Sequence, residues 1–174
     1  MKRLALALLL AMPLFAIARE AAAPTTETDE ARFVRLTREL EQQPLTDAPD
    51  PNLGWLLNWA TETPDYVVTL CMMAGPDWDM RDPFAGKLLV IASAGNMAWQ
   101  IEHGADSDEL SKQLAGTETA LRIYRATIAQ DPSKKSAFFD SLVAKRDAGT
   151  LRAYLAPFVA ENCVDQQENG KIDA

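Results

Sequence analysis

The chain has 174 residues and a formal net charge of −8 at pH 7, from 17 basic and 25 acidic side chains. Nucleic acids and anionic membrane surfaces attract clusters of Lys and Arg, so this balance argues against both as partners. One histidine and two cysteines are present. A zinc site normally takes several His or Cys ligands, and we expect neither a metal ion nor another cofactor.

The N-terminal segment has the pattern of a cleavable secretory signal. A positively charged start precedes an apolar run from Leu4 to Phe15, and the small residues of Ala16-Ile17-Ala18 follow. The run is shorter than the ~20 apolar residues that span a bilayer, and no cysteine follows it to carry a lipid anchor. We expect residues 1–18 to be removed and the mature protein to be periplasmic or secreted, with 15 basic and 25 acidic side chains and a net charge of −10.

The remaining chain predicts one domain. Residues 19–29 lack apolar periodicity and predict a flexible leader, residues 30–164 predict the helical domain, and residues 165–174 predict a polar tail. The fold class that we expect is all-α, a single-domain bundle of six or seven helices with one disulfide. In an exported chain two cysteines suggest a bridge, here between Cys71 and Cys163.

Apolar periodicity and capping residues predict the first helices. Apolar residues at three- and four-residue steps predict a helix from Glu30 that ends before Pro44. Asp50-Pro51 predicts the start of a second helix, with Asp as cap and Pro at the first helical position. Thr63-Pro64-Asp65 repeats this signal. The residues that follow, YVVTLCMMA, have strand propensity, but we favour a short third helix because of the capping residues in front.

A fourth helix is predicted from Asp82-Pro83 to about His103, with Gly104 as its stop. Its small residues Ser93-Ala94-Gly95 predict that a neighbouring helix crosses closely. Asp106 and Glu109 predict the capping of another helix, which continues to Asp131-Pro132. Whether Gly116-Thr117 divides this helix into two stays open.

Two further helices complete the domain. One is predicted around Phe138 and Leu142 and stops at Gly149. The last one begins after Thr150, and its buried face includes Cys163. Pro157 lies inside this helix and predicts a kink, because proline lacks a backbone N–H and its ring clashes with the preceding turn.

Part of the fifth predicted helix resembles the second helix of a tetratricopeptide repeat. Ala120, Tyr124 and Pro132 have the spacing of that repeat, with Asp131 before the proline. Thr127 stands where the family usually has Ala. The first helix of such a repeat has an aromatic residue and a Leu-Gly pair, but this chain has Gly104, Ser107 and Asp108 at those positions. With half of one repeat and no second copy, we interpret the segment as an ordinary bundle helix.

Three sets of residues are candidates for a metal or catalytic site. Asp77, Asp79 and Asp82 carry oxygen ligands of the kind that calcium takes, but Arg81 and Leu88 occupy ligand positions of the calcium-loop pattern, so a solvated loop is expected.

Glu102 is a candidate catalytic acid, because some glycan-cleaving helical enzymes place a Glu beside aromatic residues and Trp99 lies three residues earlier. His103 is the lone histidine; without a Gly-x-Ser-x-Gly turn we interpret it as structural, favoured at a helix C-terminus.

The tryptophans point to a binding surface. On the second predicted helix Leu53, Leu56, Leu57 and Ala60 form one aliphatic stripe. At ~100° per residue, Trp55 and Trp59 lie together off that stripe. Either the helix is buried on two sides, or it exposes a Trp ridge to solvent.

These patterns favour a non-enzymatic protein that binds a protein partner, such as an inhibitor or immunity-type protein. The expected contact residues are Trp55 and Trp59, because Trp is favoured at interface hot spots. The alternative is a cell-wall-directed hydrolase that uses Glu102 or the carboxylates of residues 77–82. Whether the protein is an enzyme stays open, as do its partner and oligomeric state.

Overall fold

The computed structural model describes residues 26–69 and 84–163. This part of the chain contains six α-helices, one 3-10 turn and no strand, which confirms the predicted all-α class. The elements are α1 (Asp29–Leu40), α2 (Pro51–Glu62), α3 (Ala85–His103), α4 (Glu109–Gln130), η1 (Pro132–Lys134), α5 (Ala137–Asp147) and α6 (Leu151–Asn162).

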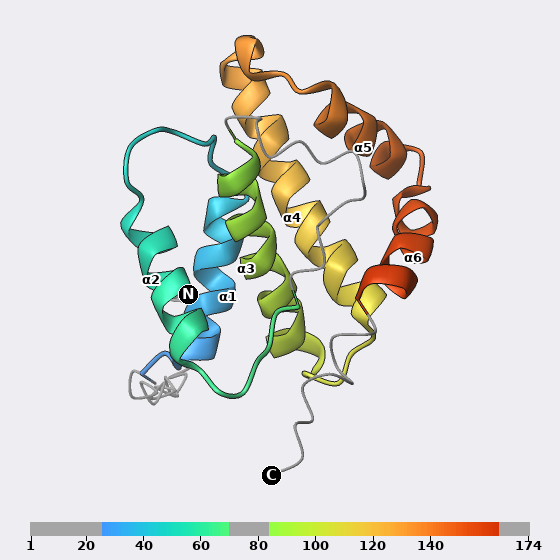
Figure 1. The fold of residues 1–174 in the computed structure, drawn as a ribbon. Helices are drawn as coiled ribbons and strands as arrows, with labels where there is room; N and C mark the ends of the chain where they lie inside the picture. The colour runs from blue at the N-terminus through green and yellow to red at the C-terminus, as the bar shows by residue number, and fades with distance from the viewer. Residues whose placement is uncertain (1–25, 70–83, 164–174) are drawn as a thin grey trace, which may run out of the picture.

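The two longest helices, α3 and α4, form the centre of the molecule (Figure 1). They run in opposite directions and are joined by the short segment 104–108. Helices α1 and α2 pack on one side of this pair, and α5 and α6 lie on the other side along α4 (Figure 1). None of the helices in residues 26–69 and 84–163 is long and apolar enough to cross a membrane.

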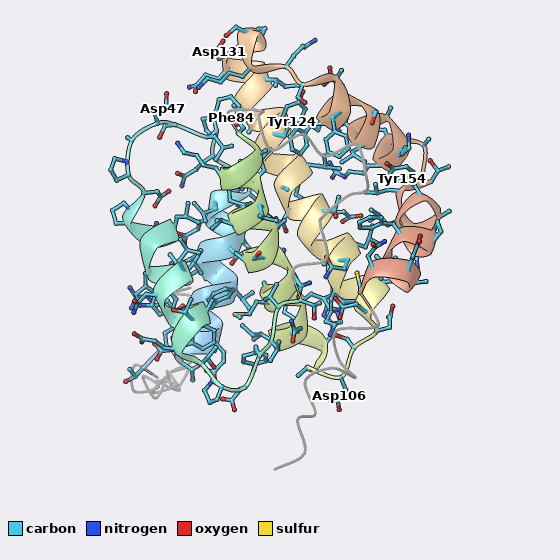
Figure 2. All side chains as sticks on the ribbon, in the orientation of Figure 1. Asp47, Phe84, Asp106, Tyr124, Asp131 and Tyr154 are labelled. Atoms are coloured by element: carbon cyan, nitrogen blue, oxygen red, sulfur yellow. The ribbon has the colours of Figure 1, made fainter. Side chains whose placement is uncertain are left out.

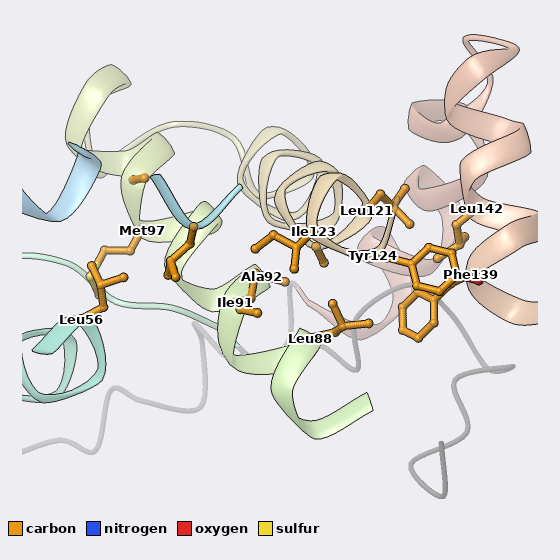
Figure 3. Close-up of a cluster of buried hydrophobic side chains, with 14 of the residues drawn as sticks. Leu56, Leu88, Ile91, Ala92, Met97, Leu121, Ile123, Tyr124, Phe139 and Leu142 are labelled. Atoms are coloured by element: carbon orange, nitrogen blue, oxygen red, sulfur yellow. The ribbon is translucent and has the colours of Figure 1, made fainter. Parts of the chain in front are cut away.

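The core is continuous from α2 to α5. Leu56 and Met97 lie at one end of the close-up view, and Phe139 and Leu142 lie at the other (Figure 3). All four side chains are at most 2% exposed. The residues between them come from α3 and α4, so these two helices connect the flanking pairs into one domain.

Two glycines allow the central helices to approach closely. A Cβ atom built on Gly95 would lie 2.5 Å from Oγ1 of Thr119, and one built on Gly116 would lie 2.5 Å from the Ala92 carbonyl oxygen. The close crossing predicted from Ser93-Ala94-Gly95 is therefore confirmed. Gly116 lies in the middle of α4, which is one continuous helix.

Several predicted helix ends are confirmed. Asp50 caps α2 by accepting hydrogen bonds from the backbone N–H of Asn52 and Leu53. Gly104 and Gly149 end α3 and α5 with positive φ angles of 95° and 69°, a conformation that glycine adopts without steric cost. Helix α6 begins after Thr150 and contains Pro157.

The predicted cap of α4 is two residues too early. The N-cap is Asp108, whose carboxylate accepts a hydrogen bond from the Ser111 backbone N–H. Asp106 lies instead in the turn between α3 and α4, at the opposite end of the molecule from Asp47 and Asp131 (Figure 2). The Asp-x-Asp sequence offers two caps, and the geometry of the short connection decides between them.

The predicted third helix is wrong for residues 63–69, which are not helical. Their backbone groups are bound by side chains of the central helices. Nε2 of Gln100 donates to the Val67 carbonyl at 2.9 Å, and Nε2 of Gln113 donates to the Thr69 carbonyl at 2.9 Å. Both hydrogen bonds are partly buried, and the two glutamines supply donors to carbonyls that would bind backbone N–H groups in a helix.

The predicted disulfide involves one residue that the structure describes. Cys163 lies at the C-terminus of α6 and is 1% exposed, so it shares the buried face as predicted. Cys71 lies outside the described residues. The bridge between them stays a prediction.

Candidate functional site

The two predicted contact tryptophans lie side by side on α2. Their rings are stacked, with centroids 6.1 Å apart and planes inclined by 11°. Both side chains are partly buried, while the neighbouring Leu56 is 1% exposed. Trp55 and Trp59 therefore form the border between the core and the surface, which is intermediate between the two arrangements that the sequence allows.

Helix α1 covers part of this tryptophan pair. The Phe33 ring lies 5.0 Å from the Trp59 ring, and the Arg32 guanidinium lies 4.2 Å from the Trp55 ring centroid. Tyr66 contacts Trp59 from the other direction, with centroids 6.2 Å apart. A cation over an aromatic face is attracted by its quadrupole, so Arg32 shields one face of Trp55 from water.

Two large apolar side chains near this pair are exposed. Leu57 is 41% exposed and Val67 is 71% exposed. Leu57 was expected to be part of the aliphatic stripe of α2, but its side chain is not fully covered by α1 and α3, which pack against this helix. The side chain lines an apolar cleft of about 220 Å³ instead.

The cleft lies between α2 and α3. Its lining consists of Phe33, Leu53, Leu56, Leu57, Ala60, Thr61, Val68, Val90, Ser93, Ala94 and Met97. No ionisable side chain is among these residues. We refer to Trp55, Leu57, Trp59 and Val67, together with this cleft, as the α2 surface.

The chain around the α2 surface is acidic. Residues 39–80 contain no Lys, Arg or His. Six acidic residues occur within residues 39–69, namely Glu39, Glu41, Asp47, Asp50, Glu62 and Asp65. Glu39, Glu41 and Asp47 form ion pairs, and Arg32 contacts Trp55, so the excess negative charge beside the α2 surface rests on Asp50, Glu62 and Asp65. This excess favours a partner that brings positive charge as well as apolar groups.

Glu102, the candidate catalytic acid, lines a different cleft of about 610 Å³. Its carboxylate accepts a hydrogen bond from Nη2 of Arg38 at 2.7 Å. A carboxylic acid that protonates a leaving group is typically placed in an apolar pocket. Glu102 contacts a guanidinium instead, so its surroundings differ from those that a catalytic acid needs.

Glu41 connects α1 with α4 in the same cleft. Its Oε1 accepts hydrogen bonds from Arg38 at 2.7 Å, from Arg122 at 2.8 Å and from the Thr119 hydroxyl at 2.7 Å. Arg122 also pairs with Glu118 at 3.0 Å. No sequence pattern indicated this network, because Glu41 is 78 positions from Thr119 and 81 positions from Arg122.

His103 is the last residue of α3, the helix end at which the sequence placed it. Its ring stacks on Trp99 with centroids 3.6 Å apart, and Nδ1 lies 3.1 Å from the Trp99 carbonyl oxygen. Among residues 26–69 and 84–163, no group of three or more His, Cys, Asp or Glu side chains could hold a metal ion. The candidate metal ligands Asp77, Asp79 and Asp82 lie outside these ranges.

The chain was compared with protein families, with curated proteins and with solved structures, and none of them matches.

Proposed function

We propose that this chain is an exported protein-binding module whose contact site is the α2 surface. The observation that carries this proposal is that Leu57, which is 41% exposed, lines an apolar cleft on the helix that carries the stacked tryptophan pair. Val67, which is 71% exposed, follows Tyr66, the residue that contacts Trp59. An apolar patch on an otherwise acidic surface usually marks a contact site. Two partly buried indole rings add the large rigid area that is typical of interface hot spots.

The chemistry of the surface specifies the partner. The cleft of about 220 Å³ takes one large apolar side chain. The acidic residues around it attract Lys or Arg and repel other acidic proteins. We therefore propose a basic protein that inserts an apolar side chain between α2 and α3. An inhibitor or immunity-type role is consistent with a small acidic protein of this kind.

The experiment compares proteins that co-purify with the tagged chain from its native host. Leu57→Asp and Val67→Asp place a charge on the apolar contact area, and because both residues are exposed the fold should be preserved. Ala160→Asp is the matched control, since it adds the same charge at an exposed position of α6.

Mass spectrometry should identify a basic protein that is bound by the wild-type and Ala160→Asp chains and is lost from the other two variants. Its binding should weaken as salt is raised. Equal recovery with all four chains, or a partner without basic residues, would contradict the proposal.

We also propose that export is accompanied by formation of the Cys71–Cys163 bridge. Support comes from the sequence, with its secretory pattern and two cysteines, and from the burial of Cys163. The protein purified from the native host should begin near Arg19. Its mass should increase by about two units on reduction. An unchanged mass together with two titratable thiols would contradict the bridge.

A further inference from the structure

The larger cleft, of about 610 Å³, has a size typical of small-molecule sites, roughly 300–1,000 Å³. One face of α4 forms its floor. Residues of this face recur at three- and four-residue steps, as neighbours on a helix surface do: Ser111, Leu114, Ala115, Glu118 and Arg122. Side chains from α1, α3 and α6 form its walls.

The ion-pair network that joins Glu102 to Glu118 in this cleft has a surplus of negative charge. Among the described lining residues there, the guanidinium groups of Arg38 and Arg122 face three carboxylates, those of Glu41, Glu102 and Glu118. Each arginine already pairs with two of these carboxylates. Two positive against three negative charges leave a net charge of −1, and the Glu102 and Glu118 side chains remain 33% and 34% exposed.

The end of the cleft near Ser111 carries a guanidinium that is only weakly paired. Nη1 of Arg152 donates to the Ser111 hydroxyl at 3.1 Å. Within residues 26–69 and 84–163, the one carboxylate that Arg152 contacts is that of Asp108, 3.5 Å from Nη2. The Arg152 side chain is 52% exposed. A planar guanidinium in this situation can take a carboxylate in two parallel hydrogen bonds.

The two ends are separated by an apolar floor of fixed length. Ser111 and Glu118 are seven residues apart on one helix, which corresponds to about 10.5 Å. Leu114 and Ala115 lie between them. Three residues of extended chain span about 10 Å, so a tripeptide has the length that joins the two ends.

We infer that this cleft binds a short peptide of about three residues with free amino and carboxyl ends. Arg152 binds the carboxylate, and Glu118 and Glu102 bind the ammonium group. Small apolar side chains of the peptide lie on Leu114 and Ala115. This site is distinct from the α2 surface, and its occupation does not depend on a protein partner.

The test uses isothermal titration of the mature chain with trialanine at low salt. Trialanine should bind saturably with 1:1 stoichiometry. Acetylation of its amino end and amidation of its carboxyl end should each weaken binding about tenfold or more, because each removes one charged contact. Absence of saturable binding, or equal binding of the doubly capped peptide, would overturn the inference.

Variants show which end each residue recognises. Arg152→Gln should weaken the binding of trialanine about tenfold and leave the binding of trialanine amide nearly unchanged, because the amide has no carboxylate to lose. Glu118→Gln should weaken the binding of trialanine about tenfold and leave the binding of acetylated trialanine nearly unchanged, because the acetylated peptide has no ammonium group to lose. Arg125→Gln is the control, because this exposed arginine of α4 pairs with Asp147 away from the cleft.

Thermal unfolding of the three variants checks that each is folded. If Arg152→Gln binds none of the peptides, the substitution has damaged the cleft and has not merely removed a carboxylate contact. That result, or equal affinity of wild type and Arg152→Gln for trialanine, would contradict the proposed orientation.

Discussion

Gly95 and Gly116 face each other where α3 crosses α4. A Cβ atom on Gly95 would lie 3.1 Å from the Gly116 Cα atom, and a Cβ atom on Gly116 would contact the Ala92 carbonyl oxygen at 2.5 Å. Backbone atoms lie on both sides of this contact, so the rotation of a side chain cannot make room for a residue larger than glycine.

We predict that Gly116→Ala destabilises the protein by about 1–3 kcal/mol, the usual cost of overpacking. The steric cost outweighs the helix propensity of Ala, which favours the substitution by at most about 1 kcal/mol. Gly86→Ala is the control, because nothing lies within 4 Å of a Cβ atom there. Urea unfolding should show lower stability for Gly116→Ala and equal or higher stability for Gly86→Ala; a stabilised Gly116→Ala would disprove the close crossing.

Tyr124 anchors α5 to α4 through its hydroxyl. The oxygen accepts a hydrogen bond from the Ser136 backbone N–H at 2.8 Å and donates to Oδ1 of Asp140 at 2.8 Å. Tyr124→Phe should cost about 1–3 kcal/mol of unfolding free energy, because it leaves buried polar groups without a partner. Tyr66→Phe should change stability by less than about 0.5 kcal/mol, since the Tyr66 hydroxyl has no hydrogen bond in the described part of the chain. Equal losses for the two variants would contradict this role.

Gln100 holds residues 66–69 against α3 through a hydrogen bond to the Val67 carbonyl. Gln100→Met preserves the size of the side chain but removes the donors to the Val67 carbonyl and to Oδ1 of Asn96. We expect faster amide hydrogen exchange in residues 66–69, by a factor that corresponds to about 1–2 kcal/mol. Exchange elsewhere in α3 should change less. Gln130→Met, at an exposed position of α4, is the control, and unchanged exchange in Gln100→Met would show that the segment is held by other contacts.

Acid should weaken the N-terminus of α4. Hydrogen bonds from the Ser111 side chain and backbone N–H hold the pKa of Asp108 below its ordinary value. A carboxyl with a lowered pKa contributes stability above its unfolded-state pKa and loses it as pH falls through the folded-state pKa. Between about pH 5 and pH 2, the stability difference between wild type and Asp108→Asn should therefore shrink. Asp106→Asn, which removes no cap, should track the wild type across this range; a constant difference for Asp108→Asn would rule out the linkage.

The two tryptophans should differ in their contribution to stability. Trp59 contacts Phe33, Trp55 and Tyr66, whereas Trp55 contacts Trp59 and the Arg32 guanidinium. Trp59→Ala should cost about 2–3 kcal/mol and Trp55→Ala about 1 kcal/mol, less than the 3–5 kcal/mol of fully buried large aromatics. Chemical denaturation measures both values. A loss above about 4 kcal/mol for each would mean that the pair belongs to the core and is not available for binding.

The sequence predicted several helix ends that depend on nearby residues. Asp50-Pro51, Gly104 and Gly149 act on backbone groups within a few positions, so their effect can be judged without the fold. The small residues near Gly95 likewise indicated a close crossing. The sequence also placed Trp55 and Trp59 together on one side of a helix, because that follows from the helical repeat alone.

The tertiary structure decided the features that depend on distant partners. Residues 63–69 follow a helix-capping signal, yet their carbonyls are bound by Gln100 and Gln113, 33 and 44 positions away. Glu102 accepts a hydrogen bond from Arg38, which is 64 positions away in the chain. This bond connects α3 with α1 in the lining of the larger cleft. Local propensities are worth tenths of a kcal/mol to about 1 kcal/mol per residue, and a net hydrogen bond contributes about 0.5–1.5 kcal/mol, so two such bonds can outweigh a weak capping signal. Where the two conflict, the long-range hydrogen bond determines the conformation.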